Sequence, residues 1–191
     1  MRQFKLLFSI SGSIAAYKAA ETISKLVQKG YEVQVVTTKS ALKFIGTATL
    51  EGLTGKKVMT DTFENGQMMS HIDLVKWADI MILAPATAST INSMRSGLGN
   101  NLLLSLFLAH DWQKPYIIAP AMNTKMWTHP ATKKSLAQLQ EWGVKVLEPN
   151  TGDLACGDYG PGRMIEPTEI IHHLENNIRT KNKVSVLITS G

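Results

Sequence analysis

The chain has 191 residues, of which 44% are hydrophobic and 18% charged, a mixture typical of a globular domain and unlike a disordered, collagen-like or low-complexity protein. Twenty Lys and Arg residues against fifteen Asp and Glu give a formal charge of +5, but the basic residues are scattered, which argues against nucleic-acid binding. The single cysteine, Cys156, excludes an internal disulfide, and no Cys or His spacing around it suits a metal site.

The first predicted elements are buried strands and amphipathic helices that alternate along the chain. Strands are predicted at 6–10, 33–37, 80–84 and 116–119 and, from a weaker pattern, at 144–147. Helices are predicted at 14–29, 88–94, 101–109, 132–142 and 168–178, the first of them ending at Gly30. This alternation predicts an α/β fold: a Rossmann-like (flavodoxin-like) parallel sheet with helices on both faces, in three α/β/α layers.

Two segments depart from this pattern. Residues 152–162 contain four glycines and Pro161, so we predict an irregular, mobile loop that could act as a lid. Residues 181–183 are polar and precede an apolar run at 184–191, which resembles the first strand of a further domain. We therefore expect one domain at 1–180 and, at 181–191, a linker and the start of a second domain.

Membrane association and export are not indicated. The N-terminus shows no apolar segment with a cleavage site, and the longest uncharged stretch, 80–94, is interrupted by Pro85 and several hydroxyl residues. A membrane-spanning helix needs about 20 predominantly apolar residues. We therefore expect a cytoplasmic protein.

Small and hydroxyl-bearing residues follow two of the predicted strands, at 9–16 and at 84–91. Ligands bind open α/β sheets at the carboxyl ends of the strands, and helix N-termini there attract phosphate. Two such turns suggest a mononucleotide, and Thr37, Thr38 and Ser40 add hydroxyls at the same edge. A simple helix cap at the first turn and close helix packing at the second remain alternatives.

Three further side chains are candidates for chemistry. Asn123 follows the strand at 116–119 and could be a helix cap or a ligand-binding amide. A lone cysteine is usually a small packed residue, but Cys156 stands on the glycine-rich segment beside Arg163, where we expect an exposed thiol that can exchange a proton. His71 is a candidate base, although spacing alone does not separate it from His110 or His129.

Five motifs, taken together and in order, resemble those of the homo-oligomeric flavin-containing cysteine decarboxylases. They are GSIAAYK at 12–18, SHIDL at 70–74, PATASTI at 85–91, PAMNTKMW at 120–127 and ACGDYGPGRM at 155–164. The combination of the histidine, PAMN and the cysteine segment is far more specific than any one motif. One departure is Asn100-Asn101, where relatives usually carry an acidic residue before the Leu-Leu stretch.

The resemblance implies roles for residues at the matching positions. His71 would be the active-site base, Asn123 the residue that holds the substrate carboxylate, and Cys156 the acid on a flap. FMN would be bound by Gly12, Ser13, Ile14, Thr38, Ser40, Phe44, Thr87, Ala88, Ser89, Thr90 and Ala121. The substrate would contact Asn123, Met122, Ala155 and Arg163, and no metal is implied.

The resemblance also implies a reaction, the FMN-dependent decarboxylation of 4'-phosphopantothenoylcysteine to 4'-phosphopantetheine in coenzyme A biosynthesis. Direct loss of CO2 would leave an unstabilised carbanion, so in the family mechanism the flavin first oxidises the carbon bearing sulfur to a thioaldehyde and re-reduces the ene-thiol after CO2 has left. The resemblance further implies a homo-oligomer, a trimer or a dodecamer of trimers with FMN at each interface. A ligase domain fused after residue 181 is expected by the same comparison.

Three alternatives fit the motifs less well. Peptidyl-cysteine decarboxylases are similar around the histidine and the Pro-x-Met-Asn region, but generally lack the cysteine segment. Prenyl-flavin synthases have neither PAMN nor the cysteine. A non-catalytic flavin-binding regulatory subunit can lose the catalytic residues, whereas His71, Asn123 and Cys156 are all present here.

Overall fold

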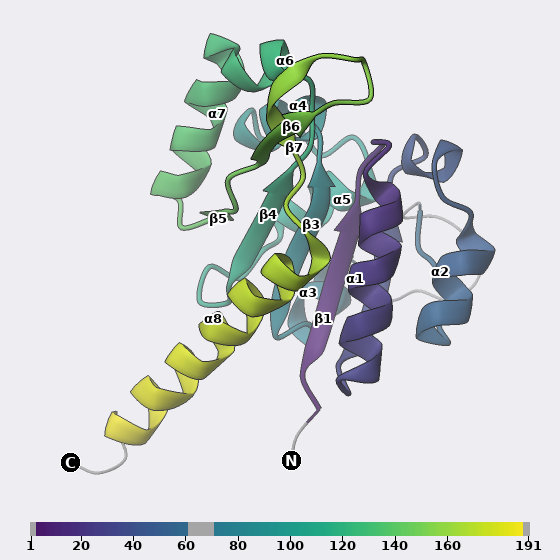
Figure 1. The fold of residues 1–191 in the computed structure, drawn as a ribbon. Coiled ribbons are helices and arrows are strands. Elements are labelled where there is room, and N and C mark those ends of the chain that lie inside the picture. The colour runs from purple at the N-terminus through teal and green to yellow at the C-terminus, as the bar shows by residue number, and fades with distance from the viewer. Residues whose placement is uncertain (1–2, 61–70, 189–191) are drawn as a thin grey trace.

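A five-stranded parallel sheet forms the centre of the molecule (Figure 1). The computed structural model describes residues 3–60 and 71–188, with side chains described as far as Ile178. The strand order is β2-β1-β3-β4-β5, formed by β1 (Lys5–Ile10), β2 (Glu32–Thr37), β3 (Ile80–Ala86), β4 (Tyr116–Pro120) and β5 (Lys145–Val146). Every pairing in this sheet is parallel, which confirms the predicted fold class.

Strand side chains alternate between two cores, one on each face of the sheet. Leu6 and Phe8 belong to one cluster, whereas Leu7 between them belongs to the other. Because successive side chains of a strand point to opposite faces, a nearly all-apolar strand such as β3 is what a sheet covered on both sides requires.

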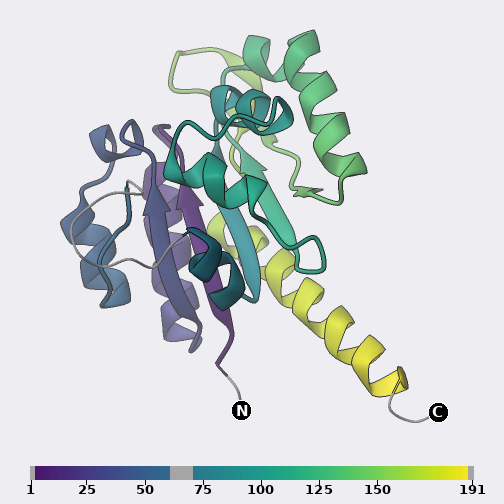
Figure 2. The same cartoon turned by 180° about the vertical axis from the view of Figure 1, so that it is seen from behind.

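Helices cover both faces, as Figures 1 and 2 show from opposite sides. The first core is covered by α1 (Ala16–Gln28), α2 (Thr47–Thr54) and α8 (Pro167–Ile188). The second is covered by α3 (His71–Trp77), α4 (Ala88–Arg95), α5 (Leu102–Leu108), α6 (Thr124–Thr128) and α7 (Pro130–Glu141). The helices predicted from the sequence did not include α2, α3 and α6, all short, or the 3-10 turn at Ala41–Lys43.

The prediction of an irregular segment at 152–162 is wrong, because most of it forms a hairpin. β6 (Asn150–Asp153) pairs antiparallel with β7 (Tyr159–Arg163), and only the tip between them is a turn. The glycines serve close packing here: a Cβ on Gly160 would collide with the side chain of Thr124, and one on Gly162 with the carbonyl oxygen of Met122. We call residues 150–163 the flap.

The strand predicted at 184–191 is also corrected for the residues that the structure describes. Helix α8 continues through that region as far as Ile188. A strand needs a neighbouring strand to pair its backbone N–H and C=O groups, whereas a helix pairs them within itself. In the described part of the chain no helix is both long and apolar enough to cross a lipid bilayer.

Candidate functional site

One cavity of about 1150 Å³ opens at the carboxyl ends of four strands. Its walls come from the turns that follow β1, β2, β3 and β4, together with the flap. Small-molecule pockets usually measure roughly 300–1,000 Å³, so this volume is sufficient for a cofactor and a second molecule.

The buried side chain of Ser11 joins the two hydroxyl-rich turns. Its hydroxyl donates to the carbonyl of Pro85 at 2.7 Å and accepts from the backbone N–H of Thr87 at 3.0 Å. Gly12 brings the third turn close, because a Cβ there would stand 2.6 Å from the hydroxyl of Ser40. The three turns are therefore held in one fixed arrangement.

The groups presented by these turns suit a phosphate-bearing ligand. Ser13 precedes α1, and its hydroxyl accepts from the N–H of Ala15, the residue before the helix. Thr87 is the N-cap of α4, and its hydroxyl accepts from the N–H of Thr90 in the first turn. The hydroxyls of Thr38 and Ser40 lie 2.9 Å apart on the turn that follows β2. Helix N-termini and hydroxyl donors are the features that bind phosphate groups in α/β proteins. These residues thus fit the mononucleotide expected from the sequence.

Asn123 and Cys156, which are 33 residues apart in the chain, meet at the other end of the cavity. The Asn123 side-chain oxygen accepts from the Lys125 N–H at 2.8 Å and so caps α6. Its Nδ2 donates to Cys156 Sγ at 3.0 Å and to Asp158 Oδ2 at 3.0 Å. The sequence left open whether Asn123 is a cap or a binding amide. The structure shows the cap, and the amide nitrogen contacts the flap.

Asp158 is charged at neutral pH. The hydrogen bond from Asn123 lowers the pKa of this carboxyl, and the contact from Cys156 and the positive charge of Lys125 lower it further, against a small opposing effect of desolvation. An anion therefore stands beside the only thiol of the chain.

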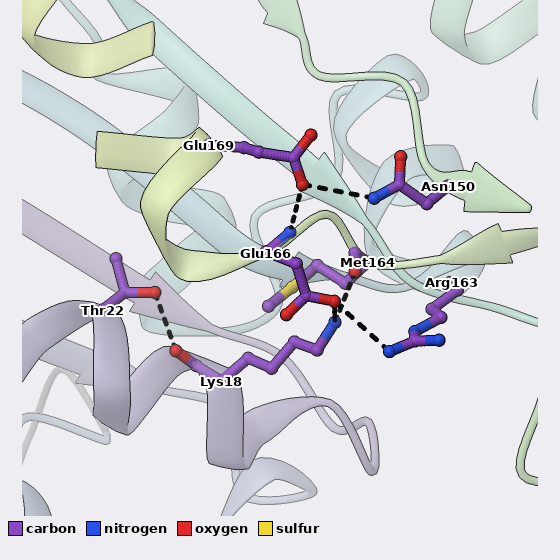
Figure 3. Close-up of polar contacts among 7 residues, drawn as sticks. All are labelled: Lys18, Thr22, Asn150, Arg163, Met164, Glu166 and Glu169. Atoms are coloured by element: carbon purple, nitrogen blue, oxygen red, sulfur yellow. Dashed lines mark hydrogen bonds and ion pairs between the residues drawn. The ribbon is translucent and has the colours of Figure 1, made fainter. Parts of the chain in front are cut away.

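The base of the flap is tied to α1 by a buried lysine (Figure 3). The Lys18 side chain is 4% exposed, and its Nζ lies 2.8 Å from both the Met164 carbonyl and Glu166 Oε1. Arg163 approaches the same carboxylate at 3.3 Å. The hydrogen bond from Lys18 is the largest cause that lowers the pKa of Glu166. This network fixes the strand that leads out of the flap.

Of the residues predicted for the site, all but two line this cavity. Around it lie Gly12, Ser13, Ile14, Thr38, Ser40, Thr87, Ala88, Ser89, Thr90, Ala121, Met122, Asn123, Ala155, Cys156 and Arg163. His71 is instead the first residue of α3, and Phe44 is a half-exposed residue after the 3-10 turn. Ser70, which precedes His71 in its motif, lies outside the described residues.

Sequence reasoning missed Lys18, Asp158 and the segment at 99–101, all of which contribute to the site. Lys18 and Asp158 are inside recognised motifs, but only the fold shows what their side chains contact. Asn101 accepts from the Leu104 N–H at 3.0 Å, so the unusual Asn-Asn pair still supplies the cap of α5. Among the described residues, no group of three or more His, Cys, Asp or Glu is placed to hold a metal ion.

Comparisons with known proteins agree with this geometry. A family model described as Flavoprotein matches residues 1–179. The coenzyme A biosynthesis bifunctional protein CoaBC of Vibrio parahaemolyticus is 43% identical over 98% of this chain and 47% of its own length. The probable phosphopantothenoylcysteine decarboxylase of Streptococcus mutans is 39% identical over 91% of this chain and 98% of its own.

A solved structure gives the same result in three dimensions. A cysteine-to-serine mutant of PPC decarboxylase complexed with pantothenoylaminoethenethiol shares 34% identity, with a TM-score of 0.83 over 93% of this chain and all of that one. The chain belongs to the flavoprotein family. It spans about half the length of the bifunctional relatives that it matches.

Proposed function

We propose that this chain is an FMN-dependent phosphopantothenoylcysteine decarboxylase that forms 4'-phosphopantetheine in coenzyme A biosynthesis. The observation that carries the proposal is the meeting of Asn123 and Cys156 over a cavity whose far end presents phosphate-binding turns. The identity to decarboxylase relatives supports it. The proposal keeps the cytoplasmic location expected from the sequence.

We propose that the flavin is FMN. The phosphate-binding features belong to two turns that Ser11 joins, so that one ligand phosphate could contact both. One solved relative, a protein with 34% identity and a TM-score of 0.80, is described as the FMN binding protein AtHal3. Gly12, Ser13, Thr38, Ser40 and the turn at 87–90 would hold the cofactor. When bound, flavin supplies the two-electron oxidation and re-reduction that a cysteine carboxylate needs before and after losing CO2.

The protein's own residues would orient the substrate and move protons. In this assignment Asn123 Nδ2 donates a hydrogen bond to the substrate carboxylate. To do so it gives up one of its two present contacts on the flap, with Cys156 or with Asp158. An amide orients the carboxylate without adding a charge that would oppose its departure. Cys156 then gives a proton to the carbon that has lost CO2. Ala155, Met122 and Arg163 line the same end of the cavity and would contact the substrate.

His71 leads us to propose that the working site lies between subunits of a homo-oligomer. As a base it must approach the substrate, yet it is absent from the walls of the cavity within one chain. Three apolar side chains at the cavity are strongly exposed: Ile14, Tyr17 and Met126. An exposed apolar rim marks an interaction surface. A neighbouring copy would cover this rim and bring its His71, giving the trimer or dodecamer of trimers expected above.

The expected second domain also stays a proposal. Its support is that the relative from Vibrio parahaemolyticus is described as bifunctional and is about twice as long as this chain. A phosphopantothenate–cysteine ligase would follow the decarboxylase in the full protein. Assaying this chain alone for ligation of phosphopantothenate to cysteine tests that division, and ligation by residues 1–191 would refute it.

One experiment tests cofactor, substrate and activity together. The visible spectrum of the purified protein is recorded before and after phosphopantothenoylcysteine is added, with CO2 measured in the same tube. We expect a flavin spectrum and CO2 release, with no release from a peptide that ends in cysteine. A protein that takes up no FMN, or that decarboxylates only the peptide, would contradict the proposal.

Two variants test the assigned roles. Cys156→Ser should release CO2 but accumulate the ene-thiol with reduced flavin, and full turnover would remove Cys156 as the proton donor. His71→Asn should block flavin reduction by substrate, and normal reduction would exclude His71 as the base. Light scattering tests the assembly, since a monomer would contradict a site completed by a neighbouring subunit.

A further inference from the structure

The flap carries a carboxylate whose contacts join the two catalytic candidates. Asp158 Oδ2 accepts from Asn123 Nδ2 at 3.0 Å and from the Cys156 thiol at 3.5 Å. Asn123 Nδ2 also lies 3.0 Å from Cys156 Sγ. The three side chains therefore form a closed triangle in which each contacts the other two.

Backbone hydrogen bonds at α6 and within the flap hold the three side chains in place. Because Asn123 Oδ1 accepts from the Lys125 backbone N–H at 2.8 Å, its amide nitrogen must face the flap, and a flipped amide would lose this bond. On the flap, the Leu154 N–H donates to the Asp158 carbonyl at 2.8 Å, and the Gly157 N–H donates to the Leu154 carbonyl at 2.9 Å. These bonds close a tight turn that places Cys156 and Asp158 against the same amide.

A thiol that gives a proton must remain protonated until its acceptor arrives. Asn123 donates a hydrogen bond to the sulfur, whereas the Asp158 carboxylate accepts the S–H and so sets the direction of the thiol proton. Other charged groups near this region are Lys125 of α6 and two cavity residues of the flap, Asp153 and Arg163, and Lys18 and Lys39 also line the cavity. Arg163 forms an ion pair with Glu166. The Asp158 carboxylate is the charged group in direct contact with the Cys156 sulfur.

We propose that Asp158 is a positioning residue that accepts the S–H of Cys156 and aims the thiol for the protonation step. The inference rests on the proposed function. In that step the S–H bond of Cys156 breaks and a C–H bond forms at the carbon that lost CO2, with the electron pair coming from the double bond of the ene-thiolate. The thiolate left on Cys156 then takes a proton from water.

Alkylation by iodoacetamide tests this directly, because the chain has one cysteine and the reagent reacts with its thiolate. Asp158→Asn keeps the size of the side chain and removes its charge. At 3.5 Å in water the interaction with a unit charge corresponds to about a three- to tenfold effect, so alkylation of the sulfur in D158N at pH 7.5 should be faster by that factor. The gain should shrink in 1 M salt, because salt screens the charge.

Asp153→Asn is the matched control, since Asp153 is a carboxylate of the same flap that also lines the cavity. It should alkylate at the wild-type rate. Asp158→Ala should behave as D158N does, and the salt dependence separates loss of charge from a loosened flap. Wild-type reactivity in D158N, a gain that salt does not alter, or an equal gain in D153N would each overturn the proposal.

A second readout uses the complete reaction. In a single turnover D158N should slow the return of the ene-thiol to product relative to CO2 release, and an unchanged ratio of the two rates would count against the proposal. Alkylation requires neither flavin nor substrate. If the wild-type protein proves inactive, the proposed function fails while the thiol measurement still decides whether Asp158 controls Cys156.

Discussion

Replacement of Lys18 by methionine should destabilise the protein by about 2 kcal/mol. Methionine keeps most of the buried apolar stem but removes the charged donor that contacts the Met164 carbonyl and Glu166. A hydrogen bond involving a charged group contributes roughly 1.5–3 kcal/mol. Glu166 is 43% exposed and keeps water and Arg163, so its lost ion pair adds at most about 1 kcal/mol.

Removal of a buried charge offsets part of this loss, because Lys18 no longer has to be desolvated on folding. The remaining 2 kcal/mol corresponds to a fall in melting temperature of about 4–8 °C for a domain of this size. Thermal unfolding is followed by circular dichroism at one protein concentration, because a bound ligand or partner subunit shifts the midpoint by mass action.

Lys29→Met is the matched control. Lys29 also leaves α1 and pairs with Glu175 of α8 at 2.9 Å, but the two side chains are 49% and 28% exposed. Exposed pairs contribute about 0–1 kcal/mol, so this variant should melt within about 2–4 °C of the wild type. If Lys18→Met costs no more than Lys29→Met, the buried network does not anchor the flap as we infer.

Three further outcomes are expected. Gly162→Ala should lower the decarboxylation rate about tenfold or more, because the φ of +136° at Gly162 and the nearby Met122 carbonyl both oppose a Cβ. Gly143→Ala is the control: Gly143 has a φ of +98° but no neighbouring atom in the way, so the decarboxylation rate should be nearly unchanged. Asn101→Ala should cost about 1 kcal/mol of stability by urea unfolding, since it removes a helix cap. Folding lowers the pKa of Glu166 from 4.5, so the stability that its carboxylate adds is present above that pH and is lost as the pH falls. Glu166→Gln should therefore be less stable than the wild type at neutral pH, and the difference in unfolding free energy should shrink in acid.

The sequence by itself determined the fold class and most of the cavity wall. Apolar runs of strand length, such as 80–84, indicated a sheet covered on both faces, and the residues after each run became the cavity because parallel strands end at a common edge. Local patterns suffice for such inferences, since burial and turn chemistry depend on neighbouring residues in the chain.

Only the tertiary structure decided which side chains act together. Asp158 and Lys18 belong to motifs that the sequence displays, yet their partners are 35 and 148 residues away. The glycines of the flap suggested an irregular loop, but they permit a strand to pack against the Met122 carbonyl and Thr124. His71 lies outside the cavity of one chain. In the proposed assembly a neighbouring copy would supply it, and such a placement does not follow from any local pattern.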